Sequence, residues 1–381
     1  MKLWWRKSGS PCKMRSESLA LHSKIMPVTL ADIARALGVS KMTVSRAINN
    51  HPLINPQTRQ RVLEVARRMN YQPNQHARAL ATNRSSLIGL VVPDLMHSYF
   101  AEIYRGVEAV ARPLGYRNLI CNTDEEAAKE LDEAEALLPR TDGLIVASSL
   151  PPGKVGFYRR IIKGGAKVVL VDRRLEGLRC PVVTTDDVEV GLLATEHLIA
   201  LGHRRIGHLR GTAASTAAGR FEGYRRALAR HKLRFDKRLV RDCGFTEREG
   251  YEAMRGWLGE GRVPGAVFAV NDPAAIGAMQ ALEEGGVRVG RDVALVGGGN
   301  IHYGDMLRVP LTTVSWSRSE MGRQAARLLI ELIEGKEATA RKGRHIVLRP
   351  ELVVRSSCGA QRAAVGVVRW AARAGSYSVK R

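Results

Sequence analysis

The sequence has no long hydrophobic run and few cysteines. No stretch of 18 or more apolar residues occurs in the 381-residue chain, which argues against a membrane-spanning helix. The five cysteines are scattered, and no two of them form a Cys-x-x-Cys pair. This odd, dispersed set argues against a disulfide framework and a thiolate zinc site, and it predicts a reducing, cytoplasmic location. We therefore expect no metal site and no cofactor.

The motifs of common α/β enzymes are also missing. No G-x-G-x-x-G follows a predicted strand, and neither G-x-x-x-x-G-K-[ST] nor G-x-S-x-G occurs. His203 and His208 have no carboxylate at metal-ligand spacing, so we interpret both histidines as structural. No catalytic residue is predicted, and an α/β enzyme is the weaker alternative for this chain.

Acidic residues are scarce near both ends of the chain. The formal net charge is +23, of which residues 1–25 carry +5, residues 26–85 carry +7 and residues 359–381 carry +5. This distribution predicts a polyanionic partner for the N-terminal segment. A generally basic proteome is the alternative, because a basic patch without a motif is weak evidence.

The two terminal segments show no clear periodicity. We expect residues 1–25 to be a disordered extension, with Met26 as the true first residue as the alternative. The tail at residues 359–381 is basic and rich in glycine and alanine, and we expect it to be disordered as well.

Residues 30–50 read LADIARALGVSKMTVSRAINN, two short apolar-periodic segments separated by Gly38. Helices this short are marginal alone, so they must pack on each other. Gly38 lies where a tight turn needs positive φ, and Ser40 would cap the second helix. This is the layout of a helix-turn-helix, whose second helix enters the major groove of DNA. An ordinary helical hairpin with a solvated polar face is the alternative.

The second helix would present a polar and basic face. The residues expected to read DNA from it are Ser40, Lys41, Met42, Ser45, Arg46 and Asn49. Lysine and arginine can bond guanine, asparagine prefers adenine or phosphate, and methionine can contact a thymine methyl group. A third helix should follow, with Asn55 as its N-cap and Pro56 at its first position. Its apolar face would consist of Val62, Val65, Ala66 and Met69.

Residues 86–358 have a different character, since apolar runs alternate with helix-like stretches. Strands are expected at residues 87–94, 117–123, 143–149, 167–172, 205–211, 239–245, 266–272 and 293–299, with residues 312–316 and 345–355 closing the domain. Near-continuous apolar strands between helices predict parallel sheets covered on both faces. About 270 residues exceed one core, so we expect two such subdomains. The predicted fold is an N-terminal all-α helix-turn-helix domain plus an α/β effector domain of two parallel-sheet subdomains.

Seven motifs occur in order over roughly residues 26–357: VTLADIARALGVSKMTVSRAIN, VLEVARRMNYQPNQHARAL, IGLVVPD, EHLIALGHRRIGHLRG, RFEGYRRAL, NDPAAIGAMQAL and PLTTVSWSRSEMGRQAARLLIELI. With these motifs the sequence resembles the lactose-repressor family of bacterial transcription regulators. The resemblance implies a DNA-binding domain at residues 26–72, a hinge helix and linker at residues 73–85, and an effector-binding and dimerisation domain at residues 86–358. The last domain would have two lobes, like the periplasmic sugar-binding proteins.

The resemblance also implies further DNA contacts. Leu80 matches the leucine that the family wedges into the minor groove, a step that costs unstacking and gains wrapped surface; without the resemblance it would be read as a core residue. Other hinge-region matches to backbone or minor-groove contacts are Tyr71, Asn74, Ala77 and Ala81. Matches to phosphate-contacting positions are Thr29, Asn55 and Thr58, and such contacts set register rather than sequence preference.

An effector cavity should form at the carboxyl ends of the strands, between the two lobes. The candidate polar contacts are Asp94, Asp172, Arg220, Asn271 and Asp272, and the candidate wall or stacking residues are Tyr99, Phe100, Phe245 and Trp316. Core packing is the alternative for each aromatic residue, and an N-cap role is the alternative for Asp272. Arg220 matches the family's effector-binding arginine, which suits vicinal hydroxyls or a carboxylate.

One position departs from the family pattern. The family usually has aspartate where this sequence has Gly299, followed by Asn300. Loss of this carboxylate removes an acceptor for sugar hydroxyls and a negative charge, which would favour an anionic or bulkier effector. The alternative is that Asn300 or a water takes over the role. Arg220 is the one cation that the resemblance places inside the cavity, so we expect a more positive cavity than the family norm.

The function predicted from the sequence is ligand-responsive transcription regulation, most often repression. The expected partners are a palindromic double-stranded DNA operator, a small-molecule effector such as a sugar, sugar acid or related metabolite, and a second copy of the chain in a homodimer. We expect no membrane partner. A periplasmic solute-binding protein is the second alternative, and the attached DNA-binding helices argue against it.

Overall fold

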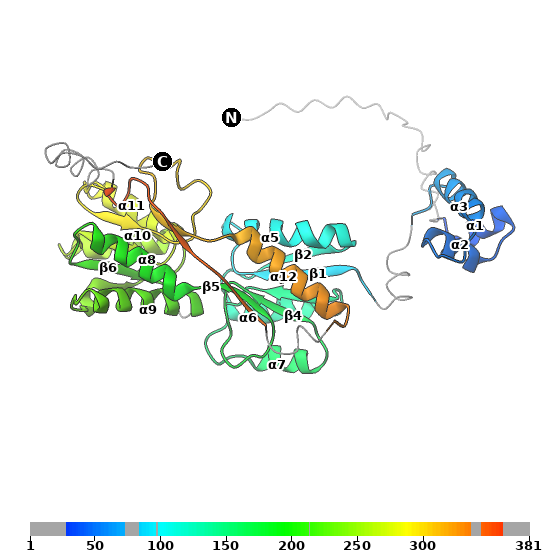
Figure 1. Ribbon diagram of the computed structural model, residues 1–381, viewed down its shortest axis with the longest axis horizontal. Coiled ribbons are helices and arrows are strands. Elements are labelled where there is room, and N and C mark those ends of the chain that lie inside the picture. The colour runs from blue at the N-terminus through cyan, green and yellow to red at the C-terminus, as the bar shows by residue number, and fades with distance from the viewer. Residues whose placement is uncertain (1–27, 73–83, 97, 213, 337–343, 361–381) are drawn as a thin grey trace, which may run out of the picture. The chain divides into compact units, whose positions relative to one another are not determined.

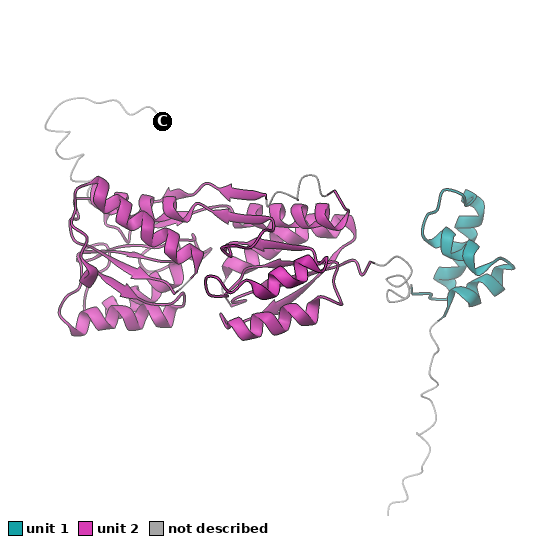
Figure 2. Ribbon diagram, turned by 90° about the horizontal axis from the view of Figure 1, so that it is seen from below, with its two compact units in different colours: residues 1–82 teal, residues 83–381 magenta. Residues whose placement is uncertain are grey.

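The computed structural model describes residues 28–72, 84–96, 98–212, 214–336 and 344–360. The chain divides by its internal contacts into two compact units, with the division between Thr82 and Asn83 (Figure 2). The predicted extension at residues 1–25 and most of the hinge segment at residues 73–85 lie outside the described residues, as does nearly all of the tail at residues 359–381.

The first unit holds three helices, α1 (Leu30–Leu37), α2 (Lys41–Ile48) and α3 (Pro56–Arg68). Their shared core consists of Ile33, Ala34, Val44, Ala47, Val62 and Ala66. Gly38 ends α1 with φ of 64°, in the left-handed region, so the predicted tight turn between the helices is confirmed. Asn55 caps α3 and Pro56 is at its start, as the sequence indicated.

The second unit consists of two lobes (Figure 1). The N-terminal lobe is built on a six-stranded parallel sheet in the order β11-β5-β4-β3-β1-β2. Its strands are β1 (Leu87–Val92), β2 (Arg117–Asn122), β3 (Gly143–Val146), β4 (Val168–Val171), β5 (Val182–Thr185) and β11 (His345–Leu348). Its helices are α5 (Ser98–Ala111), the short η1 (Arg112–Leu114), α6 (Ala127–Leu137), α7 (Gly156–Lys163) and α12 (Arg318–Ile333).

The C-terminal lobe is built on a four-stranded parallel sheet in the order β7-β6-β8-β9. Its strands are β6 (Ile206–Arg210), β7 (Val240–Asp242), β8 (Ala266–Ala269) and β9 (Ala294–Val296). Its helices are α8 (Asp187–Ala200), α9 (Ser215–Arg230), η2 (Lys237–Leu239), α10 (Glu247–Gly259) and α11 (Asp272–Glu284). The sheets confirm the predicted class of two parallel α/β subdomains.

A small antiparallel pair, β10 (Thr313–Ser315) with β12 (Glu351–Val353), lies where the chain passes between the lobes. The sequence predicted one strand at residues 345–355, but the chain makes two. β11 extends the N-terminal sheet beside β5, and β12 instead pairs with β10. Arg349 and Pro350 separate them, and proline cannot donate a ladder hydrogen bond.

One strand of the N-terminal sheet was not predicted from the sequence. β5 covers only Val182–Thr185, yet all four of its residues are buried and it lies between β4 and β11. Its run of two valines and two threonines is too short to show a clear period, because a strand of four residues gives only two alternations. Its β-branched composition was the signal available.

Helix pairs cover the sheets, and three pairs pack through reciprocal glycines. In the pair α5 and α12, a Cβ at Gly106 would overlap the Ser319 carbonyl, and one at Gly322 would overlap the Ile103 carbonyl. Gly191 and Gly223 have the same relation in α8 and α9, and Gly250 and Gly277 have it in α10 and α11. These glycines allow the backbones to approach closely, which packs the helices tightly onto the sheets.

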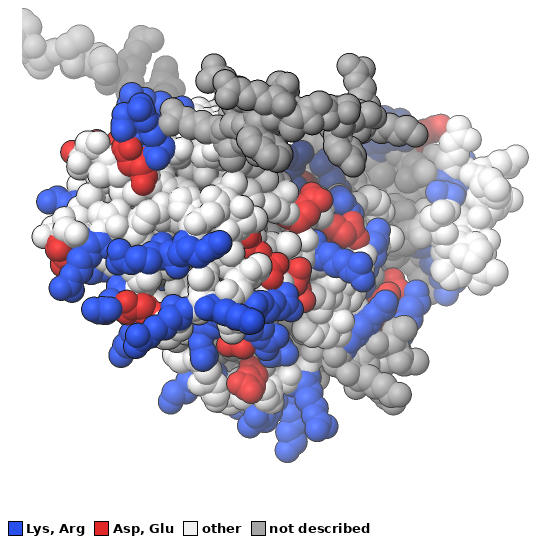
Figure 3. Space-filling model, turned by 60° about the vertical axis from the view of Figure 1, so that its left-hand side comes forward, with Lys and Arg blue, Asp and Glu red and all other residues white. Residues whose placement is uncertain are grey.

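The surface of the second unit carries charges of both signs. Figure 3 shows lysine and arginine side chains spread across the exposed face of the C-terminal lobe, with acidic groups between them. Many of these arginines have acidic partners, as in the pairs Arg226–Glu222 and Arg241–Glu260. The described part of the chain contains no helix with the length and hydropathy of a membrane span.

Candidate functional site

The second helix of the first unit has two exposed cations without ion-pair partners. Lys41 and Arg46 are exposed, and neither has an ion-pair partner among the described residues. Met42 is 61% exposed, an unusual position for a large apolar side chain. Exposed cations can contact phosphates or base edges in a DNA groove, and an exposed apolar side chain can contact a thymine methyl group.

The ends of the short helices explain several other polar residues in this unit. Ser40 accepts a hydrogen bond from the Thr43 backbone N–H at 3.0 Å, so its predicted N-cap role is confirmed. Thr29 forms a capping box with Asp32, in which its hydroxyl donates to the carboxylate at 2.7 Å. Hydrogen bonds from the Thr29 backbone and hydroxyl lower the pKa of Asp32.

The remaining DNA-contact candidates divide between described and undescribed residues. The Asn49 side-chain amide donates to the Ser45 carbonyl at 2.9 Å, and the Asn55 side chain accepts from the Gln57 N–H. Both are exposed, so a second contact is open to them, and Thr58 and Tyr71 are half-buried. The candidates that lie outside the described residues are Asn74, Ala77, Leu80 and Ala81.

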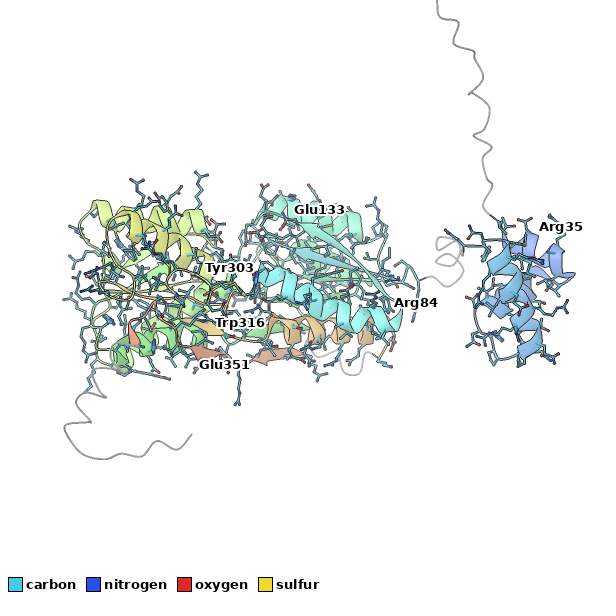
Figure 4. The ribbon with its side chains drawn as sticks, turned by 90° about the horizontal axis from the view of Figure 1, so that it is seen from above. Arg35, Arg84, Glu133, Tyr303, Trp316 and Glu351 are labelled. Atoms are coloured by element: carbon cyan, nitrogen blue, oxygen red, sulfur yellow. The ribbon has the colours of Figure 1, made fainter. Side chains whose placement is uncertain are left out.

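A cavity of about 380 Å³ lies between the two lobes of the second unit. Figure 4 shows Trp316, one of its wall residues, at the junction of the lobes. The predicted effector residues that line it are Asp94, Tyr99, Phe100, Asp172, Arg220, Phe245, Asn271 and Trp316. Most of them follow the carboxyl ends of strands in both lobes, while Tyr99 and Phe100 are on α5 and Arg220 is on α9. A position at the strand ends is typical of ligand sites in parallel α/β folds.

Asp272 is the predicted effector residue that does not line this cavity. Its side chain is 1% exposed, and the Ile301 N–H and the Thr313 hydroxyl donate to its two carboxylate oxygens. The alternative role as N-cap is wrong as well, because Asn271 caps α11 by accepting from the Ala274 N–H at 2.9 Å. The two polar residues after β8 therefore have different roles. Asn271 caps α11, and Asp272 accepts hydrogen bonds that fix the loop after β9.

Tyr99, Asp172 and Trp316 form a buried hydrogen-bonded chain in the cavity wall. The Trp316 indole N–H donates to the Tyr99 hydroxyl at 3.1 Å, and that hydroxyl donates to the Asp172 carboxylate. Burial raises the pKa of Asp172, and burial together with the nearby carboxylate raises the pKa of Tyr99. Asp172 has φ of 65°, a strained value for a non-glycine residue. These hydrogen bonds hold the Tyr99 and Trp316 rings and the Asp172 carboxylate in a fixed geometry.

Arg220 is held on three sides. Its Nε donates to the Asp187 carboxylate at 3.0 Å, its Nη1 donates to the Val270 carbonyl at 2.7 Å, and its guanidinium lies 5.1 Å from the centre of the Trp316 ring. The Arg220 side chain is 5% exposed. Burial raises the pKa of Asp187 to about 7, although Arg220 acts in the opposite direction.

A second cation, Arg173, also lines the cavity and was not predicted from the sequence. Both of its terminal nitrogens bond Glu125 at 2.6 Å, and its guanidinium lies 5.0 Å from the centre of the Phe245 ring. Its position directly after Asp172 at the end of β4 was the available signal. Other lining residues that the sequence analysis missed are Glu125, Thr212, Thr216, Gly244, Thr246, Glu249 and Gly298.

The expectation that Arg220 is the one cation in the cavity is therefore wrong, and the lining is not positive overall. Two arginines line it, together with the four carboxylates of Asp94, Glu125, Asp172 and Glu249. Arg173 is paired with Glu125, and Arg220 with Asp187. Gly299 does not line the cavity, and its neighbour Gly298 does. An anionic ligand would have to compete with these carboxyl groups for both cations, so the paired arginines do not favour an anionic effector.

His208 is a core residue, as the sequence suggested. Its side chain is fully buried among Phe221, Tyr224 and Phe268, and its Nδ1 lies 2.9 Å from the Phe268 carbonyl oxygen. Burial lowers the pKa of His208 to about 4. No group of three or more histidine, cysteine, aspartate or glutamate side chains in the described part of the chain could hold a metal ion.

Comparisons with known proteins agree with this geometry. Residues 29–74 match the family model for bacterial regulatory proteins of the lacI family, and residues 195–358 match a periplasmic binding protein-like domain. The HTH-type transcriptional regulator DegA of Bacillus subtilis is 35% identical over 335 residues, which is 87% of this chain and 98% of DegA. The HTH-type transcriptional repressor PurR of Haemophilus influenzae is 34% identical over 86% of this chain and 98% of its own length.

Solved structures show the same relation. A lac repressor dimer bound to operator and the anti-inducer ONPF aligns with a TM-score of 0.77 at 28% identity, covering 87% of this chain and 99% of that one. A complex of the transcriptional regulator CelR with cellobiose aligns with a TM-score of 0.66 at 29% identity over the same shares. The chain is a DNA-binding transcription regulator and not an enzyme, and it belongs to the LacI family of bacterial regulatory proteins.

Proposed function

We propose that a neutral, polyhydroxylated ring compound binds in the interlobe cavity and controls the affinity of the chain for its operator. The observation that carries the proposal is the pairing of both cavity cations, Arg173 with Glu125 and Arg220 with Asp187. A neutral polyol can use the paired groups as donors and acceptors without disturbing their charge balance. A carboxylate or phosphate would have to compete with Glu125 or Asp187 for a cation.

The cavity walls support a ring-shaped ligand. Four aromatic side chains line it, and Tyr99 packs edge-on against both Phe100 and Trp316, with ring centres 5.1 Å and 6.0 Å apart. Aromatic faces contact the apolar face of a saturated ring, while the Asp172 carboxylate can accept from its hydroxyls. CelR, a structural relative, is described as a complex with the sugar cellobiose, which fits the same chemistry.

We also propose that the chain forms a homodimer in the cytoplasm and that this dimer binds a palindromic operator. Two copies of α2, one per protomer, would enter successive major grooves, as in other helix-turn-helix dimers. The proposed base-reading and positioning residues are those predicted from the sequence, including Leu80 as the central minor-groove wedge. Residues 26–72, 73–85 and 86–358 would be the DNA-binding, hinge and effector domains. The lac repressor relative is described as a dimer bound to operator, which supports this assignment.

Thermal unfolding of the full chain against a panel of small molecules tests the effector assignment. Neutral mono- and disaccharides, the matching sugar acids and nucleosides are compared. A ligand present at 100 times its dissociation constant should raise the free energy of unfolding by about 2.7 kcal/mol. We expect a neutral sugar to stabilise the chain more than its acid. A sugar acid that binds more tightly than the matching neutral sugar would overturn the proposal.

Asp172→Asn and Asp132→Asn give matched variants for this test. Asp172 lines the cavity, whereas Asp132 is exposed on α6 and does not line it. Both changes remove one negative charge with little change in shape. The Asp172 variant should lose most of the ligand-induced stabilisation, and the Asp132 variant should keep it.

A further inference from the structure

The four loops that lead into the strands of the C-terminal sheet carry an excess of cations. These amino-end loops are residues 201–205 before β6, residues 231–239 before β7, residues 260–265 before β8 and residues 285–293 before β9. Because the strands are parallel, the loops meet at one edge of the lobe, opposite the edge that lines the interlobe cavity. Together they hold nine lysine and arginine residues against three acidic residues.

The opposite edge of the same sheet has no such excess. The loops that leave its strands are residues 211–214, 243–246, 270–271 and 297–312. They hold one arginine and one aspartate, Arg308 and Asp305. The positive charge is therefore concentrated at the amino ends of the strands, and the general basicity of the chain does not account for this asymmetry.

Most cations of the amino-end loops have no acidic partner. The three acids of these loops are already paired, as Asp236 with Arg238, Asp292 with Arg288 and Glu260 with Arg241 of β7. Seven exposed cations are left without an ion-pair partner among the described residues: Arg204, Arg205, Lys232, Arg234, Lys237, Arg262 and Arg291. We call these seven side chains the basic edge. Because like charges repel, an anionic partner would stabilise them.

The described part of the chain also ends beside the basic edge. A Cβ on Gly359 would lie 2.7 Å from the carbonyl oxygen of Gly290, in the loop before β9. Residues 361–381 lie outside the described residues, and their sequence carries five cations and no acid. Five further cations are therefore attached to the chain at this edge of the lobe.

The composition of the edge favours a nucleic acid over a protein as its partner. Protein–protein interfaces have an apolar core. Every residue of the amino-end loops is described, and Phe235, 40% exposed, is the only exposed large apolar side chain in them. A second copy of the chain is a poor occupant, because two-fold pairing at this edge would bring the same cations face to face. Double-stranded DNA instead offers a regular array of phosphates to spaced lysine and arginine side chains.

We propose that the basic edge binds the phosphate backbone of double-stranded DNA, as a second DNA contact in addition to the helix-turn-helix. Phosphate contacts carry no sequence information, so the edge raises the affinity for any duplex and does not read the operator sequence. Each contact releases counter-ions from the DNA, so its contribution falls as the salt concentration rises. Once the helix-turn-helix holds a duplex, neighbouring DNA is present at high effective concentration for the edge.

Two matched triple variants of the full chain test this proposal. The basic-edge variant combines Lys232→Gln, Arg234→Gln and Lys237→Gln. The control variant combines Lys154→Gln, Lys163→Gln and Arg179→Gln in the N-terminal lobe, and these three cations also have no ion-pair partner among the described residues. Each variant loses two lysines and one arginine, all at exposed positions. Both should therefore fold, and thermal unfolding checks this.

Fluorescence anisotropy measures the binding of each protein to a labelled random-sequence duplex over a series of salt concentrations. The duplex is longer than the DNA persistence length of about 150 base pairs, so that it can bend to reach both contacts. Each neutralised phosphate contributes about −0.9 to the slope of log affinity against log salt, so loss of three contacts should make the slope shallower by about 2.7. The control variant should keep the wild-type slope.

Two results would overturn the DNA contact. The first is a difference in slope below about 0.9 between the basic-edge variant and the control, which is less than one phosphate contact and includes an equal loss in both. The second comes from poly-L-glutamate in place of the duplex, which stands for an acidic protein. We expect the basic-edge variant to lose less affinity for poly-L-glutamate than for the duplex. A variant that loses affinity for poly-L-glutamate but binds the duplex as the wild type does would assign the edge to an acidic protein.

Discussion

At the scale of single residues, Arg46 on α2 is the exposed cation that we propose contacts DNA. It is exposed and has no ion-pair partner among the described residues, so its guanidinium is available to a base edge or a phosphate. The two roles differ in their consequences, because base contacts carry sequence preference and phosphate contacts do not.

Arg46→Ala should weaken operator binding by about 1–3 kcal/mol and relax preference at one operator position. Competition binding against operator variants and random DNA measures both effects. Arg35→Ala, at an exposed position of α1, is the charge-matched control. It should leave the preference at that operator position intact. Equal weakening on operator and random DNA would make Arg46 a phosphate contact instead.

A second prediction at this scale concerns His208. Its pKa is lowered by burial to about 4, below the ordinary histidine value of about 6.5. Between these two values the unfolded chain binds more protons at this residue than the folded chain. The free energy of unfolding therefore falls as pH drops through this window, by up to about 1.4 kcal/mol per pH unit from His208 alone.

His208→Phe should flatten this pH dependence, because phenylalanine fits the surrounding aromatic rings and cannot be protonated. Urea unfolding of both proteins between pH 4 and 7 gives the comparison. A variant with the same pH slope as the wild type would show that other groups carry the effect.

At the scale of elements, the helix pairs depend on reciprocal glycines. A Cβ at Gly322 in α12 would overlap the backbone carbonyl of Ile103 in α5, and backbone cannot rotate away as a side chain can. The same relation in three helix pairs indicates that close backbone approach sets the distance between the helices that cover each sheet. Because Tyr99 and Phe100 are on α5, this spacing also positions two walls of the interlobe cavity.

Gly322→Ala should destabilise the second unit by about 1–3 kcal/mol or more through overpacking. Gly259→Ala in α10 is the matched control, since nothing lies within 4 Å of its added Cβ. The control should be neutral or stabilising, because alanine reduces the freedom of the unfolded chain. Chemical denaturation of both variants measures the difference, and similar stabilities would refute the packing argument.

At the scale of the whole molecule, much of the fold could be predicted from the sequence. The ends of the short helices were predicted from Gly38, Ser40, Asn55 and Pro56, because caps and turns depend on local residue chemistry. Long apolar strands between helices gave the two parallel subdomains. The short strand β5 and the division of residues 345–355 between two sheets were missed, since partners distant in sequence determine both.

Part of the lining of the interlobe cavity was predicted from the sequence, but the charge of the lining was not. Position at a strand end and the family resemblance together identified half of the lining residues. The pairing of Arg220 with Asp187, and the presence of Arg173 with Glu125, depend on how segments far apart in sequence meet. Asp272 was misplaced for the same reason, because its partners Ile301 and Thr313 lie about 30 and 40 residues further along the chain.

If a neutral ligand in the interlobe cavity controls operator binding, it must change the affinity of a separate unit of the chain for DNA. Fluorescence anisotropy of labelled operator with the full chain, titrated with the best neutral sugar from the thermal screen, measures this coupling. Wild type and Asp172→Asn are compared at one salt concentration, because affinity for DNA varies steeply with salt. We predict that the sugar shifts the operator dissociation constant of the wild type by about fivefold or more, the lower range of typical coupling between sites. Asp172→Asn should bind operator equally well without sugar and show no shift. An equal shift in both proteins, or none in the wild type, would contradict the account.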